Sequence, residues 1–285
     1  MPIRVYKKTS AGRRNASVNM HAEVTKFTPE SALLRPKPKS GGRNNSGKCV
    51  SRGIGGGVKQ MLRVIDFSRR DRHGVEGKVV GVEYDPNRSC HIALIEYADG
   101  VRRYIPAPAG LTDGMTVVSS NDGPVEPAVG NSMKLRYVPT GLDVHCVELI
   151  PGRGAQMCRS AGTYARLSNR EDDYATLVLP SGEVRRVPLE CRATIGQVGN
   201  PDHRLRKLGK AGLSRLMGRR PITRGIAKSH HAHPLGGGSG RSKGNRPPVG
   251  PTGVGAKGGN TRNPRKASAK LIVRRRVSTR YGQKK

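Results

Sequence analysis

The last third of this sequence has almost no negative charge to balance its positive charge. Residues 201–285 hold 23 lysines and arginines and a single acid, Asp202. Residues 1–74 are also basic, with 17 basic and 4 acidic side chains, whereas residues 75–200 are nearly neutral, with 13 basic and 15 acidic. A segment charged like the last third repels itself and does not compact alone. The sequence therefore predicts a folded centre between two cationic extensions that need a polyanion such as RNA or DNA.

The sequence gives no indication of membrane insertion or secretion. Its apolar runs are about four or five residues long, too short to span a bilayer, and it has no basic amphipathic helix for a membrane surface. Residues 1–10 lack the apolar core of a signal peptide. Residues 1–22 are free of acids, as in a mitochondrial presequence, but the same basic composition continues past residue 50. We expect a cytoplasmic protein, with an organellar origin left open.

The central region is typical of β structure. Short segments rich in valine, isoleucine and tyrosine alternate with turn residues, and no sustained helical period is present. Turns are expected at 85–87, 98–100 and 180–182. The expected strands are 78–84, 91–97, 101–106, 134–138, 144–150, 174–179 and 183–187.

This pattern predicts an all-β fold of two small barrels or a sandwich, with a boundary in the turn-rich stretch 119–131. The extensions contain many glycines and prolines and are expected to be irregular, apart from one short helix within 205–219. The predicted domains are an N-terminal extension 1–59, two β domains at 60–122 and 123–200, and a C-terminal extension 201–285.

Several segments match the residue pattern of an enzymatic or metal-binding motif but lack the residues or the structural context that the chemistry needs. Gly42–Cys49 resembles a phosphate loop, but Cys49 stands where a hydroxyl is needed, and Gly253–Gly258 lacks the flanking strand and helix of a dinucleotide site. His230, His231 and His233 have no rigid frame for zinc. No catalytic motif is present. We expect no enzyme, cofactor or metal, and an enzyme using these histidines is the weakest alternative. The odd set of cysteines without a close pair favours reduced thiols: Cys49, Cys90, Cys146, Cys158 and Cys191.

The composition suits recognition of RNA by its phosphates and shape. Arginine binds phosphate with two hydrogen bonds, and glycine lets the backbone approach closely. Aromatic residues are only 4% of the chain, which argues against modules that stack bases. A nucleic-acid chaperone or DNA-compacting protein would share this charge and is the main alternative. Arginines near predicted turns, such as Arg88, Arg153 and Arg159, are candidates for phosphate contacts.

Many segments together resemble the ribosomal protein L2 family of bacterial type. The similarity runs from about residue 3 to 276, so the N-terminus is expected to be mature. The segments are GGRNNSGK (Gly41–Lys48), RGIGGGVKQ (Arg52–Gln60), RVIDFSR (Arg63–Arg69), VEYDPNRS (Val82–Ser89), ALIEYADGVRRYIPAPAGL (Ala93–Leu111), RSAGTYA (Arg159–Ala165), LPSGEVRRV (Leu179–Val187), ECRATIGQVGN (Glu190–Asn200), LGKAG (Leu208–Gly212), GRRPITRG (Gly218–Gly225), HPLGGGSGR (His233–Arg241) and IVRRR (Ile272–Arg276).

The resemblance implies an OB-like barrel followed by an SH3-like barrel and an extended basic tail. It implies a structural protein of the large ribosomal subunit that is a primary binder of 23S-type rRNA and is needed for association of the subunits. It also implies contacts with neighbouring ribosomal proteins and with the small subunit at the intersubunit bridge, and a tail that organises RNA near the peptidyl transferase centre. Arg88 and Arg159 match arginines that the family uses on rRNA, and His233 matches a tail histidine of the family. The full candidate rRNA-binding set is Arg43, Arg52, Arg63, Arg69, Arg88, Arg153, Arg159, Arg219, Arg220, Arg224, His233, Arg241, Arg274, Arg275 and Arg276.

The sequence departs from the family in the histidine loop. The family pattern Asp-His-Pro-His-Gly-Gly-Gly-Glu-Gly here reads Ala-His-Pro-Leu-Gly-Gly-Gly-Ser-Gly over residues 232–240. Without the aspartate, no charged network can orient His233 for proton transfer, so we expect packing or hydrogen bonding to RNA instead. Ile54 and Val58 replace residues that are commonly basic or histidine, which weakens the expected phosphate contacts there.

Overall fold

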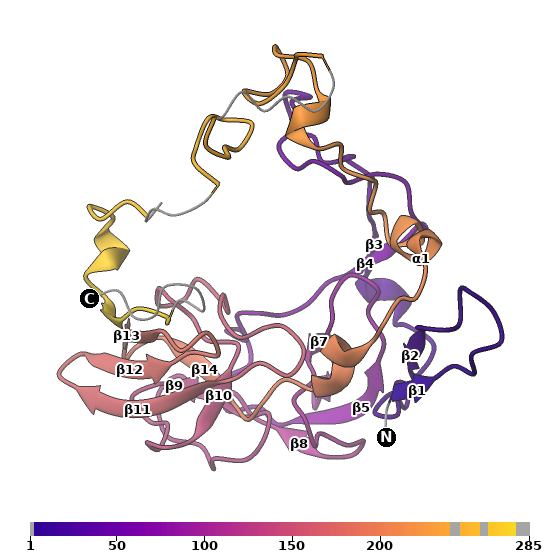
Figure 1. Ribbon diagram of the computed structural model, residues 1–285. Coiled ribbons are helices and arrows are strands. Elements are labelled where there is room, and N and C mark those ends of the chain that lie inside the picture. The colour runs from indigo at the N-terminus through magenta and orange to yellow at the C-terminus, as the bar shows by residue number, and fades with distance from the viewer. Residues whose placement is uncertain (1–2, 240–245, 257–261, 278–285) are drawn as a thin grey trace. The chain divides into compact units, whose positions relative to one another are not determined.

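The chain divides into two compact units, each assembled from separate stretches of sequence. The computed structural model describes residues 3–239, 246–256 and 262–277 (Figure 1). Unit 1 comprises residues 1–37, 59–210 and 267–285, and unit 2 comprises residues 38–58 and 211–266. The two β regions expected from the sequence both lie in unit 1.

The first β region of unit 1 is a four-stranded antiparallel sheet. Its strands are β5 (Gly77–Glu83), β6 (Ile92–Tyr97), β7 (Arg102–Pro106) and β8 (Thr116–Val117), in the order β7-β6-β5-β8. Buried β-branched residues such as Val79, Ile95 and Ile105 form its core. The register shifts between Val79 and Gly81, and residues 25–26 approach this irregularity because their N–H groups donate to the Val82 carbonyl.

The second β region is a seven-stranded sheet with the order β15-β13-β12-β11-β10-β14-β9. Its core contains Met133, Leu135, Val144, Leu167 and Leu177, all fully buried. Each strand pairs antiparallel with its neighbours. Strands β10 to β13 pair in chain order, β14 pairs with both β10 and β9, and β15 pairs with β13. The strands are β9 (Ser132–Lys134), β10 (Asp143–His145), β11 (Ala165–Glu171), β12 (Tyr174–Val178), β13 (Val184–Pro188), β14 (Arg192–Ile195) and β15 (Ile272–Arg274).

Shorter elements complete the described chain. Strand β1 (Ile3–Val5) pairs with β2 (Ser17–Asn19), and β3 (Leu34–Pro36) pairs with β4 (Met61–Arg63). One α-helix is described, α1 (Ala211–Leu216), and short 3₁₀ turns lie at Ser31–Leu33, Pro201–Leu205, Gly225–Ala227 and Ala267–Ala269. None of the described helices is long and apolar enough to cross a membrane.

The all-β class predicted from the sequence is confirmed, and both predicted hairpins of the first sheet are present. The strand expected at 144–150 is shorter, because Cys146 has a left-handed φ of 50° that ends β10. The sequence missed β8, β11 and β14, the strand expected at 134–138 is a turn after Lys134, and the helix within 205–219 is only α1.

The extensions contain more regular structure than the expectation of irregular chain. Strand β15 lies in the predicted C-terminal extension, yet it pairs with β13, and the N-terminal extension contributes β1, β2 and β3. The four-part division at residues 59, 122 and 200 stays a prediction, because unit 1 and unit 2 group the chain differently.

Candidate nucleic-acid interface

Two predicted arginines from different β regions meet on one aromatic ring. The guanidinium carbon of Arg88 lies 5.5 Å from the centre of the Phe67 ring, and that of Arg159 lies 4.9 Å from it. Arginine stacks on aromatic faces and still keeps N–H donors free at its edges. The ring therefore holds two guanidinium groups close together, an arrangement suited to phosphate groups of a folded nucleic acid.

The position of Arg88 is set by the turn that precedes it. The buried Asp85 carboxylate accepts hydrogen bonds from the Asn87 backbone N–H (2.8 Å) and from Nε of Arg88 (2.6 Å). The Asn87 side chain donates in turn to the Met61 carbonyl at 2.7 Å. Asp, Pro and Asn favour such side-chain-capped turns, so the local sequence fixes this arginine before any ligand arrives.

Arg159 is tied to the same turn from the other β region. The backbone N–H of Ala161 donates to Oγ of Ser89 at 3.1 Å, and the Cys90 thiol lies 3.5 Å from the Arg159 carbonyl. The Asn200 side chain donates to the Ser89 carbonyl at 2.7 Å. These contacts hold the two arginine-bearing loops together, so the pair on Phe67 follows from the packing of the two sheets.

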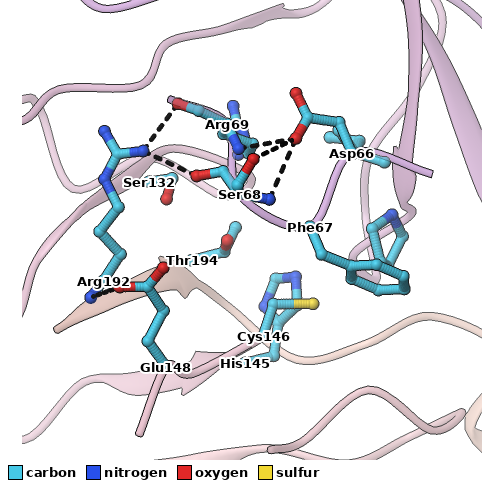
Figure 2. A pocket seen from close by; sticks show the side chains of 12 residues that line it. Asp66, Phe67, Ser68, Arg69, Ser132, His145, Cys146, Glu148, Arg192 and Thr194 are labelled. Atoms are coloured by element: carbon cyan, nitrogen blue, oxygen red, sulfur yellow. Dashed lines mark hydrogen bonds between the residues drawn. The ribbon is translucent and has the colours of Figure 1, made fainter. Parts of the chain in front are cut away.

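Buried arginines near Phe67 join the two β regions, and Figure 2 shows Arg192 directed toward the backbone of Ser68 and Arg69. Nη1 of Arg192 donates to the Ser68 and Arg69 carbonyls at 2.8 and 2.7 Å, and Nη2 donates to Nδ1 of His73 at 2.8 Å. Nη1 of Arg69 donates to the Gly130 carbonyl at 2.7 Å. Burial lowers the pKa of both arginines. Backbone carbonyls accept hydrogen bonds from Nη1 of each arginine, while the buried Nε of each has no partner among the described residues. A cavity of about 20 Å³ beside them has room for a single water.

Glu148 positions a third predicted arginine. Its buried carboxylate accepts N–H bonds from Gly154 (2.8 Å), Gly152 (3.2 Å) and Arg192 (3.1 Å). Two of these bonds fold the loop that carries the exposed Arg153, and Ala155 N–H donates to the Phe67 carbonyl at 2.9 Å. The structure thus brings the loops of Arg88, Arg153 and Arg159 to Phe67.

Other predicted residues of unit 1 have different environments. Arg69 is 7% exposed, and its burial between the β regions argues against a direct phosphate contact. Arg63 is half-buried and donates to the Met61 carbonyl at 3.0 Å. Arg274, Arg275 and Arg276 are exposed at and after β15, where Arg274 pairs with Val184 of β13.

In unit 2 the predicted arginines are exposed, and the histidine is not. The exposed arginines are Arg43, Arg52, Arg219, Arg220 and Arg224. His233 is buried, because its ring packs directly against Gly225, where a Cβ would come within 2.3 Å. Its Nδ1 accepts the Leu235 N–H at 3.0 Å, so the ring packs within the unit, and the expected contact with RNA stays a prediction. Arg241 lies outside the described residues.

The charges of unit 2 have no internal counterpart. Residues 38–58 contain four lysines and arginines and residues 211–266 contain twelve, while neither stretch contains an aspartate or glutamate. All 20 acids of the chain therefore belong to unit 1. Such a surface attracts polyanions strongly, with an affinity that falls as salt increases.

The buried cysteines and His145 have pKa values that keep them uncharged at neutral pH, which suits packing in the core. Burial raises the pKa of Cys146 to about 12 and that of Cys90 to about 11, so both thiols stay protonated and unreactive at neutral pH. His145 is buried in β10, and burial lowers its pKa to about 4. His91 is also buried, as expected for a core histidine. Among the described residues no group of histidine, cysteine and carboxylate side chains is arranged to hold a metal.

Sequence reasoning missed the residues that support the arginines. Phe67 is one of only two phenylalanines, and Arg192 and Glu148 lie far from the arginines in sequence. The Asp-Pro-Asn turn before Arg88 was the only local signal. The others depend on contacts between distant segments, such as the bond between Arg192 and Ser68, 124 positions apart.

Comparisons with known proteins agree with these features. Residues 30–119 match the family model of the RNA-binding N-terminal domain of ribosomal proteins L2, and residues 128–253 match that of the L2 C-terminal domain. The chain is also similar to the large ribosomal subunit protein uL2 of Rhodopirellula baltica. The two are 58% identical over 286 residues, which cover 100% of this chain and 99% of the relative.

Proposed function

The chain belongs to the ribosomal protein L2 family, and we propose that its arginine pair on Phe67 is a principal contact with large-subunit rRNA. The protein is a structural, rRNA-binding constituent of the ribosome. The observation that carries the proposal is the convergence of Arg88 and Arg159, from two β regions, on one ring. Because both guanidiniums are held in place, little side-chain entropy is lost when phosphates bind.

Unit 2 supports binding by a different route. Its basic residues have no acid within the unit, so phosphates are the natural counterions. The arginines predicted from the sequence, other than the buried Arg69, form the proposed rRNA-contacting set together with His233. In this proposal Arg69 acts from beneath the surface by holding the two β regions together.

The finer parts of the proposal follow from the family. The rRNA is of the 23S type, and the partners include neighbouring ribosomal proteins and the small subunit at an intersubunit bridge. The tail organises RNA near the peptidyl transferase centre without catalysing a reaction, and the protein acts in the ribosome of the cytoplasm. The OB-like and SH3-like domains are 60–122 and 123–200, between extensions 1–59 and 201–285.

The arginine pair is tested by replacing both arginines with alanine. The Arg88→Ala, Arg159→Ala double variant should bind large-subunit rRNA at least about tenfold more weakly, with a salt slope shallower by about 1–2. Phe67→Leu keeps both charges but removes the ring, and it should give a smaller loss. Filter binding over a range of KCl concentrations measures both quantities.

Arg166→Ala is the matched control, because Arg166 is exposed in the same unit and pairs with Asp143 at 3.0 Å. Its affinity should stay within about twofold of the wild type. We call Phe67, Arg88 and Arg159 the Phe67 cluster. Equal losses of affinity in Arg166→Ala and in the double variant would overturn the role of this cluster. Equal affinity of the wild type for rRNA and for duplex DNA would favour the chaperone alternative instead.

A further inference from the structure

Unit 2 contains a hollow of about 410 Å³ that lies outside the Phe67 cluster. Arg43 and Arg220 line it, together with Ile54, Pro221, Ser51 and the exposed Cys49. Three glycines supply the rest of the wall, so much of the lining is bare backbone. Its volume falls in the ~300–1,000 Å³ range of small-ligand sites, which is enough for one nucleotide.

The hollow has walls fixed by backbone pairing within the unit. The Gly55 N–H donates to the Gly218 carbonyl at 2.9 Å, and the Arg220 N–H donates to the Gly53 carbonyl at 2.8 Å. At Gly53 a Cβ would lie 2.8 Å from the Ile222 side chain, so the two segments approach closely only because glycine is there. The hollow is therefore formed by the fold of the unit itself.

The lining combines two kinds of surface. Neither the Arg43 nor the Arg220 guanidinium has a hydrogen bond or ion pair within the described part of the chain, and unit 2 has no carboxylate to offer. Ile54 and Pro221 add apolar surface beside them. Paired phosphates fit the guanidiniums, and the flat face of a base fits the apolar wall or stacks on an arginine plane.

We propose that this hollow receives one unpaired nucleotide of the rRNA, with its base against Ile54 and Pro221 and its flanking phosphates on Arg43 and Arg220. The inference rests on the proposed function, and it adds recognition of an unstacked base to the contacts with phosphate. Ile54, which replaces a commonly basic residue, then contributes apolar contact where the sequence alone suggested only a lost charge.

Cys49 makes the proposal testable without changing the charge. It is the exposed thiol, whereas Cys158 is half-buried and Cys90, Cys146 and Cys191 are buried. Brief treatment of the full-length protein with N-ethylmaleimide should modify Cys49 alone, as mass spectrometry would verify, and the adduct should fill the hollow. We expect the adduct to weaken rRNA binding by about tenfold, the effect of losing one stacked base.

The decisive readout is the reactivity of rRNA bases. Dimethyl sulfate and a carbodiimide together report unpaired bases of all four kinds, and hydroxyl radicals report the backbone. The unmodified protein should protect at least one unpaired base that becomes reactive again with the Cys49 adduct, while backbone protection elsewhere persists. Identical base protection with and without the adduct would overturn the inference. Absence of any backbone footprint with the unmodified protein would instead overturn the proposed function.

Matched variants distinguish base protection by the hollow itself from an effect of positive charge alone. Arg43→Ala should lose the base protection, whereas Lys48→Ala, which removes an exposed charge of the same unit outside both the hollow and the proposed contact set, should retain it. Cys49→Ser, compared with and without the reagent, reports any effect of modifying the other cysteines. Protection of Cys49 from alkylation by millimolar AMP alone would assign the hollow to free nucleotides and overturn the RNA assignment.

Discussion

The two units of this chain are stabilised in opposite ways. Unit 1 contains all 20 acids, and every buried hydrophobic side chain in the described residues belongs to it. Unit 2 has no acid, and the only buried side chain in its described part is that of His233. Unit 1 therefore supplies its own core and its own counter-charges. Unit 2 is held by backbone pairing and glycine contacts, and its charges are balanced only by a partner.

The largest expected difference between the units is in the response to a lost apolar side chain. Leu177→Ala removes a fully buried group from the core of unit 1 and should lower the free energy of unfolding by about 3 kcal/mol. Ile222→Ala in unit 2 removes a side chain that is 66% exposed and should change it by less than about 0.5 kcal/mol. Urea unfolding followed by circular dichroism compares them. A loss at Ile222 as large as that at Leu177 would mean that unit 2 has a core of its own.

Removal of positive charges should affect rRNA binding more in unit 2 than in unit 1, the reverse of the order expected for loss of an apolar side chain. The triple variant Arg215→Ala, Arg219→Ala, Arg224→Ala removes unpaired charges of unit 2 and should make the slope of log affinity against log salt shallower by about 2–3. The control triple variant replaces Arg102, Arg166 and Arg186, which already pair with acids of unit 1. Its slope should change less, because those charges release fewer counterions. Equal changes in the two slopes would show that internal pairing does not matter for rRNA binding.

A smaller effect is expected from the dependence of stability on pH, and it arises from a buried histidine of unit 1. The folded-state pKa of His145 is about 4 against an ordinary value of 6.5, so between these values the unfolded chain binds the proton and the folded chain does not. Stability is fully present above about pH 6.5 and is lost as the pH falls toward 4, by about 1–2 kcal/mol at pH 5.

The His145→Gln variant isolates that contribution. Its free energy of unfolding should fall less steeply than that of the wild type between pH 7 and pH 5, whatever its stability at pH 7. An unaltered slope in His145→Gln would show that this histidine is not kept neutral by burial.

Local signals explain what could be predicted from the sequence. The turn residues at 85–87 and 98–100 predicted the hairpins β5–β6 and β6–β7, because their side chains and glycine favour reversal of the chain within a few residues. The position of Arg88 follows from the same turn. The uneven charge likewise indicated which stretches lack acids, although it did not show that 38–58 and 211–266 form one unit.

Contacts between distant segments explain what could not be predicted. No local pattern shows that Arg192 caps the carbonyls of Ser68 and Arg69, or that Phe67 supports arginines from both β regions. The low aromatic content argued against a base-stacking module, and it concealed the value of a single ring. Strand β15 was missed because its arginines read as tail, whereas its pairing with β13 depends on backbone groups that every residue has.

The pairing of β15 with β13 has a topological consequence. Because β15 pairs with β13, the basic stretch between residues 210 and 267 is attached to unit 1 at both of its ends. A free end can be threaded between nucleic-acid helices that are already in place. A loop fixed at both ends can only be laid against them, or have RNA fold around it, unless the last strand first detaches. The order in which β15 docks and RNA folds therefore decides which assembled arrangements can be reached at all.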